Sequence, residues 1–179
     1  MMSPFSGLPS GRPERRPMKS VGLIMGSDSD LPVIRKAADV LRQLEIPFEV
    51  HVYSAHRTPD EAMAYAESAK SRGIGVLVCA AGMAAHLAGS IAARTTLPVI
   101  GIPCSGGLLG GLDALLSTVQ MPSGIPVAAV AVDGGANAAL QAAQMLALSD
   151  GALGERLEKL RAMAKEKVLS RDADIASRL

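Results

Sequence analysis

Apolar runs alternate with amphipathic segments along the chain from residue 20 onward. The runs are short, rich in Val, Ile, Leu and Ala, and bounded by Gly or polar residues, which is typical of strands buried on both faces. Between them, apolar residues recur at the spacing of a helix face, most clearly at Ile34, Ala37, Ala38 and Leu41. The pattern predicts strands at 21–26, 48–54, 75–81, 97–103 and 125–132.

A helix is predicted after each of these strands. Ser29 or Asp30 can cap the first helix, and Pro32 is tolerated in its first turn. The other helices are expected at 59–69, 86–95, 112–119 and 136–148. Alternation of strands and helices predicts an α/β fold in which a parallel sheet lies between two helical layers. We therefore expect a three-layer αβα, flavodoxin-like parallel sheet.

An extra C-terminal helix is predicted after Gly151. Its apolar face comprises Leu153, Leu157, Leu160 and Ala164, and such a face either closes its own domain or packs on a neighbouring subunit. At the other end, residues 1–18 contain four of the eleven prolines, which is typical of a disordered tail. We expect a single domain over 19–170, including the C-terminal helix, and a frayed C-terminus over 171–179.

The 179 residues suffice for a sizeable core, but composition restricts what that core contains. Aromatic residues make up 2% of the chain, so the core must be aliphatic, and a stacking platform for single-stranded nucleic acid is not expected. The formal net charge is +1, so we expect no nucleic-acid and no membrane partner. No apolar run reaches the roughly 18 residues of a spanning helix.

The two cysteines, Cys79 and Cys104, lie in or beside apolar runs. We expect buried, inert free thiols and a reducing, cytoplasmic compartment. The chain has no C-x-x-C or H-x-x-x-H spacing, so no metal site is expected. His51 lies in the middle of an alternating strand and is predicted to be a surface residue.

Three of the predicted strand ends carry polar or glycine-rich sequences, and ligands bind at the carboxyl ends of strands in open parallel sheets. The first is Gly26-Ser27-Asp28-Ser29-Asp30. Backbone N–H groups at a helix start attract anions, and the serine hydroxyls add donors. The carboxylates would repel a phosphate, so one of them suits ribose hydroxyls instead. The alternative is plain helix capping by Ser or Asp.

The second strand end carries Ser54-Ala55-His56-Arg57-Thr58-Pro59. The planar guanidinium of Arg57 suits a phosphate, and His56 suits acid–base catalysis near neutral pH. Functional residues concentrate in such loops. The alternative is an exposed turn that Thr58 caps.

The third strand end is the small-residue segment 80–89, which contains Gly82 and His86. Small residues let the backbone approach a flat ligand closely. His86 stands at the start of a predicted helix, at the same edge of the sheet as the other two loops. The alternative is a buried structural histidine.

Taken together, the loops resemble one family, the 5-(carboxyamino)imidazole ribonucleotide mutases of purine biosynthesis. The matching segments are GSDSD (26–30), SAHRTP (54–59), AAGMAAHLAG (80–89), LPVIGIP (97–103), GLDALLSTVQMPSGIPV (111–127) and ANAALQAAQMLAL (136–148). The resemblance covers about residues 20–165 and is specific, because unrelated short motifs occur in the family's order and spacing. The chain departs from many members at Met83 and Ala88, where they have Gly and Pro, and its turn at 133–135 is shorter than the longest family versions.

The resemblance implies an isomerase that moves a carboxylate from an exocyclic nitrogen to a ring carbon of an aminoimidazole ribonucleotide. The product is 4-carboxy-5-aminoimidazole ribonucleotide. The implied route is decarboxylation, trapping of carbon dioxide and recarboxylation, with histidine acid–base catalysis and without a metal, ATP or another cofactor. The resemblance also implies a homo-octamer, in which the last helix packs between subunits and the loop 104–111 serves a neighbouring subunit's site.

Roles for individual residues follow from the same resemblance. The substrate-binding residues hold the phosphate, ribose and ring, and they are Ser27, Asp30, Ser54, Arg57, Gly82 and Leu87. Of these, Asp30 matches the ribose contact, while the backbone around Gly82 and Leu87 would line the ring pocket. His56 matches the proton-shuttling histidine, and His86 matches the second histidine at the ring.

Two alternatives to the mutase stay open. A closely related carboxylase adds free carbon dioxide to aminoimidazole ribonucleotide on the same fold, although the segments QMPSGIPV and NAALQAAQ resemble the mutase branch. A non-catalytic, flavodoxin-like nucleotide-binding or signalling module could use the GSDSD loop. Such a module gives no role to the His56–Arg57 pair or to His86.

Overall fold

Parallel strands form the centre of the structure, a computed structural model that describes residues 18–176 and residue 178. In the described part of the chain the strands are β1 (Ser20–Met25), β2 (Phe48–Val52), β3 (Ile74–Gly82), β4 (Val99–Cys104) and β5 (Ala128–Ala129). They lie in the order β2-β1-β3-β4-β5, with Leu23 of β1 opposite Val50 of β2 and Val78 of β3. This is the flavodoxin strand order, which confirms the predicted fold class.

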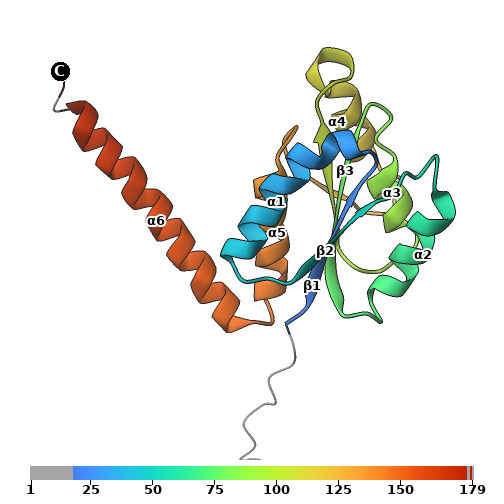
Figure 1. Ribbon diagram of the computed structural model, residues 1–179, viewed down its shortest axis with the longest axis horizontal. Helices are drawn as coiled ribbons and strands as arrows, with labels where there is room; N and C mark the ends of the chain where they lie inside the picture. The colour runs from blue at the N-terminus through green and yellow to red at the C-terminus, as the bar shows by residue number, and fades with distance from the viewer. Residues whose placement is uncertain (1–17, 177, 179) are drawn as a thin grey trace, which may run out of the picture.

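Helices cover both faces of the sheet (Figure 1). One face carries α1 (Leu31–Gln43) and α5 (Gly135–Ala147), which pack against each other. The other face carries α2 (Pro59–Ala69), α3 (Leu87–Ala92) and α4 (Leu112–Val119). Two short 3-10 helices, η1 (Asp28–Asp30) and η2 (Leu108–Gly110), precede α1 and α4.

The core consists of two largely aliphatic clusters, one on each face of the sheet, and the cluster on the α2 side also contains the buried ring of Tyr65. Alternate residues of a strand enter opposite clusters: Leu23 packs toward α1 and α5, and Ile24 packs toward α2 and α3. Both cysteines are free and buried, as expected. Burial raises the pKa of the Cys79 thiol far above its ordinary value, so this thiol is inert.

The fifth strand is much shorter than the predicted segment 125–132. Only Ala128 and Ala129 pair with β4, opposite Ile100 and Gly101. Pro126 has no N–H group to donate to a ladder, which delays the start of pairing. The remaining predictions of element type hold, with ends that differ by one to a few residues.

The C-terminal helix α6 (Gly151–Ala176) leaves the domain after its first turns (Figure 1). Leu153 is buried, Leu157 and Leu160 pack against the α1–α5 cluster, and Arg156 Nε donates to the Leu44 carbonyl at 2.9 Å. Ala164, predicted on the same apolar face, is exposed, because the helix has passed the edge of the domain there.

The helix also continues beyond residue 170, into the segment expected to fray. Its later turns contain residues such as Arg171 and Ala173, which favour the helical conformation. Four large apolar side chains on this projecting part are exposed: Met163, Val168, Leu169 and Ile175. The disordered tail predicted over residues 1–18 lies outside the described residues except for Met18.

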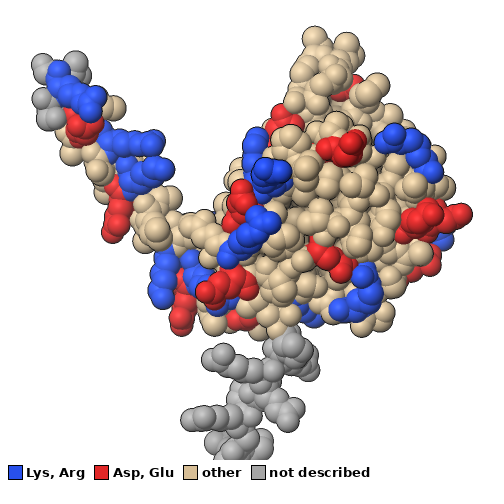
Figure 2. Space-filling model, in the orientation of Figure 1, with Lys and Arg blue, Asp and Glu red and all other residues tan. Residues whose placement is uncertain are grey.

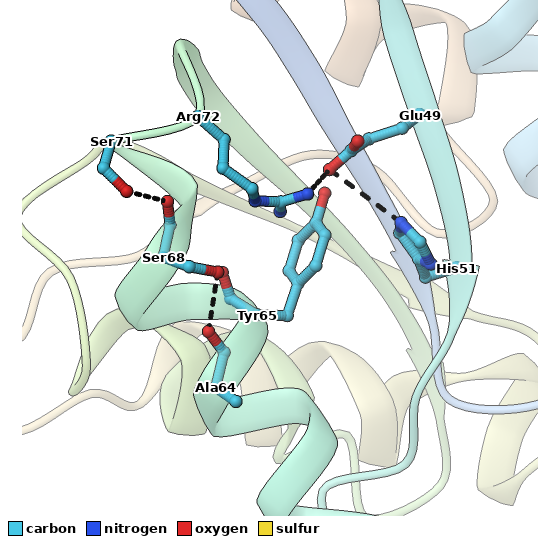
Figure 3. Close-up of polar contacts among 7 residues, drawn as sticks. All are labelled: Glu49, His51, Ala64, Tyr65, Ser68, Ser71 and Arg72. Carbon is cyan, nitrogen blue, oxygen red and sulfur yellow. Dashed lines mark hydrogen bonds and ion pairs between the residues drawn. The ribbon is translucent and has the colours of Figure 1, made fainter.

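His51 is half-buried, although the alternating pattern placed it on the surface. Its ring stacks on Tyr53 with centroids 5.0 Å apart and lies against Tyr65 at 4.8 Å. Its Nε2 atom is 3.8 Å from a carboxylate oxygen of Glu49, which also pairs with Arg72 at 2.9 Å (Figure 3). The alternation is present, but Tyr65 of α2 covers the face of β2 that carries His51, whereas Val50 and Val52 on the other face are exposed.

The surface drawn in Figure 2 intersperses Lys and Arg with Asp and Glu and shows no broad basic area. Within residues 18–176 and residue 178, no cluster of three His, Cys, Asp or Glu side chains could hold a metal ion. Among the described helices, none is both long enough and apolar enough to cross a membrane.

Candidate active site

The loops that follow β1, β2, β3 and β4 surround a cavity of about 590 Å³ at the carboxyl edge of the sheet. This edge includes the switch point between β1 and β3, where ligands bind in folds of this kind. Seven predicted site residues line the cavity: Ser27, Asp30, Ser54, His56, Arg57, Gly82 and Leu87. The eighth, His86, contacts the cavity residue His56 directly. The fold therefore brings together segments that are up to about 80 residues apart in the chain, from Gly26 to Gly106.

The loop after β1 is folded back by a reciprocal capping box. The Ser27 N–H donates to Asp30 Oδ2 at 3.2 Å, and Ser27 Oγ accepts from the Ser29 N–H at 3.4 Å. Asp30 occupies the N-cap position of α1 but makes no side-chain cap with it, because η1 intervenes and turns the carboxylate back. The side chains of Ser27 and Asp30 therefore both form the capping box and line the cavity.

The loop after β2 is a tight turn that aims Arg57 across the cavity edge. The Ser54 N–H donates to Thr58 Oγ1 at 2.8 Å, and Thr58 Oγ1 donates to the Ser54 carbonyl at 3.2 Å. Arg57 Nη2 donates to the Gly26 carbonyl at 2.9 Å, which ties this loop to the one after β1. The turn at Thr58, which was the alternative to a functional loop, is therefore present. The same turn also places the Arg57 guanidinium at the cavity.

The two histidines form a direct contact. His56 Nε2 lies 3.0 Å from His86 Nδ1, and the rings meet edge to face with centroids 5.1 Å apart. Both side chains are exposed, so the interpretation of His86 as a buried structural residue is wrong. An exposed imidazole pair at a cavity can exchange protons with a bound ligand.

The segment after β3 brings backbone to the cavity wall. Met83 adopts a left-handed conformation with φ 54°, is 66% exposed and is among the residues that line the cavity. Leu87 is buried as a side chain yet lines the cavity, as does Gly82. Both residues therefore lie where a bound ligand would contact them, and their role in holding a flat ring stays a prediction.

Asp30 is the most buried carboxylate at the site, with 8% of its surface exposed. Burial raises its pKa, although the Ser27 N–H partly offsets this effect. Beneath it, burial and the neighbouring charges of Asp30 and Asp133 raise the pKa of Cys104 to about 12. Cys104 therefore stays protonated, which supports its interpretation as an inert thiol.

Sequence reasoning missed several residues at the cavity. Ser105 and Gly106 begin the loop that the resemblance assigns to a neighbouring subunit, yet they line the cavity of their own chain. Asp133, from the turn before α5, accepts a hydrogen bond from the Ser105 N–H at 2.9 Å. The sequence signal was present in the glycine-rich composition of 104–111, but nothing local linked that loop to a residue 28 positions away.

Comparison with known proteins shows which family the chain belongs to. The family model described as AIR carboxylase matches residues 20–167, which is most of the chain. The chain belongs to the AIR carboxylase family. Curated members include an N5-carboxyaminoimidazole ribonucleotide mutase from Pyrococcus horikoshii, which is 53% identical over 148 residues, 83% of this chain and 84% of that protein.

Other relatives include both mutases and carboxylases. The mutase of the same name from Bacillus subtilis is 50% identical over 151 residues, covering 83% of this chain and 93% of that protein. A phosphoribosylaminoimidazole carboxylase from Saccharomyces cerevisiae is 51% identical over 149 residues, but these make up only 26% of that longer protein. The crystal structure of Treponema denticola PurE superposes with a TM-score of 0.78 at 25% identity, covering 87% of this chain and 98% of that one.

Proposed function

We propose that this member of the AIR carboxylase family converts N5-carboxyaminoimidazole ribonucleotide to 4-carboxy-5-aminoimidazole ribonucleotide in purine biosynthesis. The observation that carries the proposal is the convergence of Arg57, two serines, a buried carboxylate and a histidine pair on one cavity. The curated mutases match this chain over most of their own length, whereas the yeast carboxylase extends far beyond the match. The match over most of the mutases' own length favours the mutase over the carboxylase.

Phosphate recognition is assigned to Arg57, Ser27 and Ser54. A guanidinium has five N–H donors, and Arg57 uses one nitrogen on the Gly26 carbonyl, which fixes its direction while leaving donors for an anion. Ser54 Oγ accepts from the His56 and Arg57 N–H groups, so its hydroxyl hydrogen remains available to a phosphate oxygen. Binding of the ribose hydroxyls is assigned to Asp30, because its carboxylate accepts hydrogen bonds.

The histidine pair can supply the two proton transfers that the reaction needs. Breaking the N–C bond releases carbon dioxide and delivers one proton to the exocyclic nitrogen. Forming the ring C–C bond releases one proton from the ring carbon. The isomerisation therefore needs a group that donates a proton and then recovers one, and an imidazole does both near neutral pH. His56 lines the cavity and takes this role, with His86 as its hydrogen-bond partner.

The protein is further proposed to act as a homo-oligomer, an octamer by resemblance, in the cytoplasm. The exposed apolar residues of projecting α6 support association, because a solvent-exposed helix is stabilised by burying such side chains against a partner. A bound ribonucleotide, with no metal or cofactor required, is the proposed small-molecule partner.

The experiment that separates the candidate functions is a comparison of two substrates. The mutase forms the 4-carboxy product from N5-carboxyaminoimidazole ribonucleotide without added bicarbonate. A carboxylase forms it only from aminoimidazole ribonucleotide and high bicarbonate. Protein that binds the nucleotides but turns over neither would be a binding module, and the proposal would be wrong.

A further inference from the structure

The turn before α5 is joined to the end of β4 by two hydrogen bonds from a single residue, Asp133. Its N–H donates to the Pro103 carbonyl at 2.9 Å. Its carboxylate Oδ1 accepts from the Ser105 N–H at 2.9 Å. These two partners, Pro103 at the end of β4 and Ser105 just after it, flank Cys104 in the chain, so Asp133 stands opposite Cys104.

This pattern reproduces one rung of a parallel sheet with a side chain in place of the main chain. In a parallel ladder, a residue donates to the carbonyl before its opposite residue and accepts from the N–H after it. At Asp133 the main-chain carbonyl accepts from the Gly135 N–H at 2.9 Å, as the chain enters α5, and the Ser105 N–H donates to the side chain instead. The carboxylate takes its place and extends the pairing beyond the short β5.

We infer that Asp133 is a positioning residue of the active site, whose carboxylate fixes the main chain at Ser105 and so holds Ser105 and Gly106 in the cavity wall. The inference rests on the proposed function for what the cavity binds, but the anchoring itself concerns this chain alone. No contact between Asp133 and the substrate is required. Its effect passes through Ser105.

The anchored loop has little internal structure that could replace this bond. Gly106, Gly110 and Gly111 all have positive φ values, and glycine backbone is the most flexible in the unanchored state. The next fixed point is Leu108, whose N–H donates to Asp113 Oδ2 at 3.0 Å. The loop is therefore held at its start and middle by two carboxylates, and only two glycines lie between the anchored residues Ser105 and Leu108.

The conformation of Asp133 explains why an acidic residue suits this position. Its φ of 56° lies in the left-handed region, which Asp and Asn tolerate better than most residues. Hydrogen bonds from Ser105 and the nearby Lys36 charge lower the pKa of Asp133, so the carboxylate is ionised at neutral pH. A hydrogen bond to an ionised acceptor is stronger than one between neutral groups.

Two substitutions at Asp133 separate anchoring from charge. Asp133→Gly removes the acceptor without straining a left-handed backbone, and Asp133→Asn keeps an oxygen acceptor but removes the charge. Asp150→Gly is the matched control, because Asp150 Oδ1 also accepts a single backbone N–H, from Leu153 at 3.1 Å, at the opposite end of α5.

Steady-state kinetics with N5-carboxyaminoimidazole ribonucleotide give the first readout. We expect KM to rise at least fivefold in Asp133→Gly, with a smaller change in kcat, and to stay within fivefold of wild type in Asp133→Asn and Asp150→Gly. A smaller rise in Asp133→Gly, or an equal rise in Asp150→Gly, overturns the inference. If Asp133→Asn behaves like Asp133→Gly, the charge acts rather than the anchor, and the inference is likewise wrong.

Amide hydrogen exchange at Ser105 gives a second readout that needs no turnover. We expect exchange at least fivefold faster in Asp133→Gly than in wild-type protein, and slower in Asp133→Asn than in Asp133→Gly. Unchanged exchange in Asp133→Gly contradicts the anchor. Absence of turnover in wild-type protein would instead contradict the proposed function, so the two failures are distinguishable. If Asp133→Gly does not fold, Asp133→Asn is compared with wild type alone. Exchange at the Ser105 amide that is more than fivefold faster in Asp133→Asn than in wild type overturns the inference.

Discussion

His56 Nε2 and His86 Nδ1 lie 3.0 Å apart, although the two residues belong to loops that follow different strands. At this separation one nitrogen carries the hydrogen and the other offers its lone pair. Two fully protonated imidazolium rings cannot make this contact, because both nitrogens would carry hydrogen. The pair therefore fixes which ring nitrogens remain for the substrate, and it acts as one unit.

Replacement of His56 by Asn should abolish most turnover. General acid–base catalysis contributes about 10²- to 10⁴-fold, so kcat should fall by about that factor while the ribonucleotide still binds. Steady-state kinetics, together with calorimetric titration of the product, check both parts. The double variant with His86→Asn should lose no more than roughly threefold beyond His56→Asn, because effects within a unit are not additive. Retained turnover in His56→Asn refutes the catalytic assignment.

Arg57→Leu should weaken ribonucleotide binding by about 1.5–3 kcal/mol, the scale of a hydrogen bond to a charged group. This corresponds to an increase in Kd of roughly 10- to 150-fold. Arg42→Leu is the control, because Arg42 pairs with Asp39 on the exposed side of α1. Calorimetric titration should show that only the Arg57 variant loses affinity. Equal affinities for wild type and Arg57→Leu would leave the phosphate without its proposed partner.

The sequence predicted elements and loop chemistry better than it predicted connections between loops. Strand and helix periodicity is local, so the layers and the convergence of the strand-end loops followed from the pattern of apolar residues. The Arg57–Gly26 and His56–His86 contacts join loops 31 and 30 residues apart, and no periodicity encodes which atoms meet. The short β5 and the role of Asp133 depend on how the chain leaves β4, which is likewise a tertiary property.

Asp30→Asn should make the protein more stable at neutral pH and poorer at binding. Because burial raises the pKa of Asp30, its neutral form is favoured by folding. Its contribution is present below the ordinary carboxyl range and is lost as pH rises through the raised pKa. Asn keeps an acceptor for the Ser27 N–H without the buried charge.

Urea unfolding at a series of pH values measures this effect. Between the ordinary carboxyl range and pH 7, the free energy of unfolding of wild-type protein should fall relative to that of Asp30→Asn. If the difference between the two proteins is constant over this range, Asp30 is not the buried titrating group described above.

Removal of the projecting part of α6 should disrupt association while the domain remains folded. A chain that ends after residue 161 keeps the packed residues Leu153, Leu157 and Leu160 but loses the four exposed apolar side chains further on. Sedimentation velocity should give wild-type protein the mass of eight chains and the shortened protein a smaller assembly. Identical masses for the two proteins would show that the projecting helix does not hold subunits together.

Transfer of the substrate's own carboxylate is the central claim, and isotope retention tests it most directly. The enzyme is given N5-carboxyaminoimidazole ribonucleotide whose carboxylate carbon is isotope-labelled, in buffer that contains unlabelled bicarbonate, and the product is analysed by mass spectrometry. A mutase that traps carbon dioxide in its cavity retains the label in 4-carboxy-5-aminoimidazole ribonucleotide. Product that carries the unlabelled carbon of the buffer would contradict the account, because the carboxylate would then have come from solution.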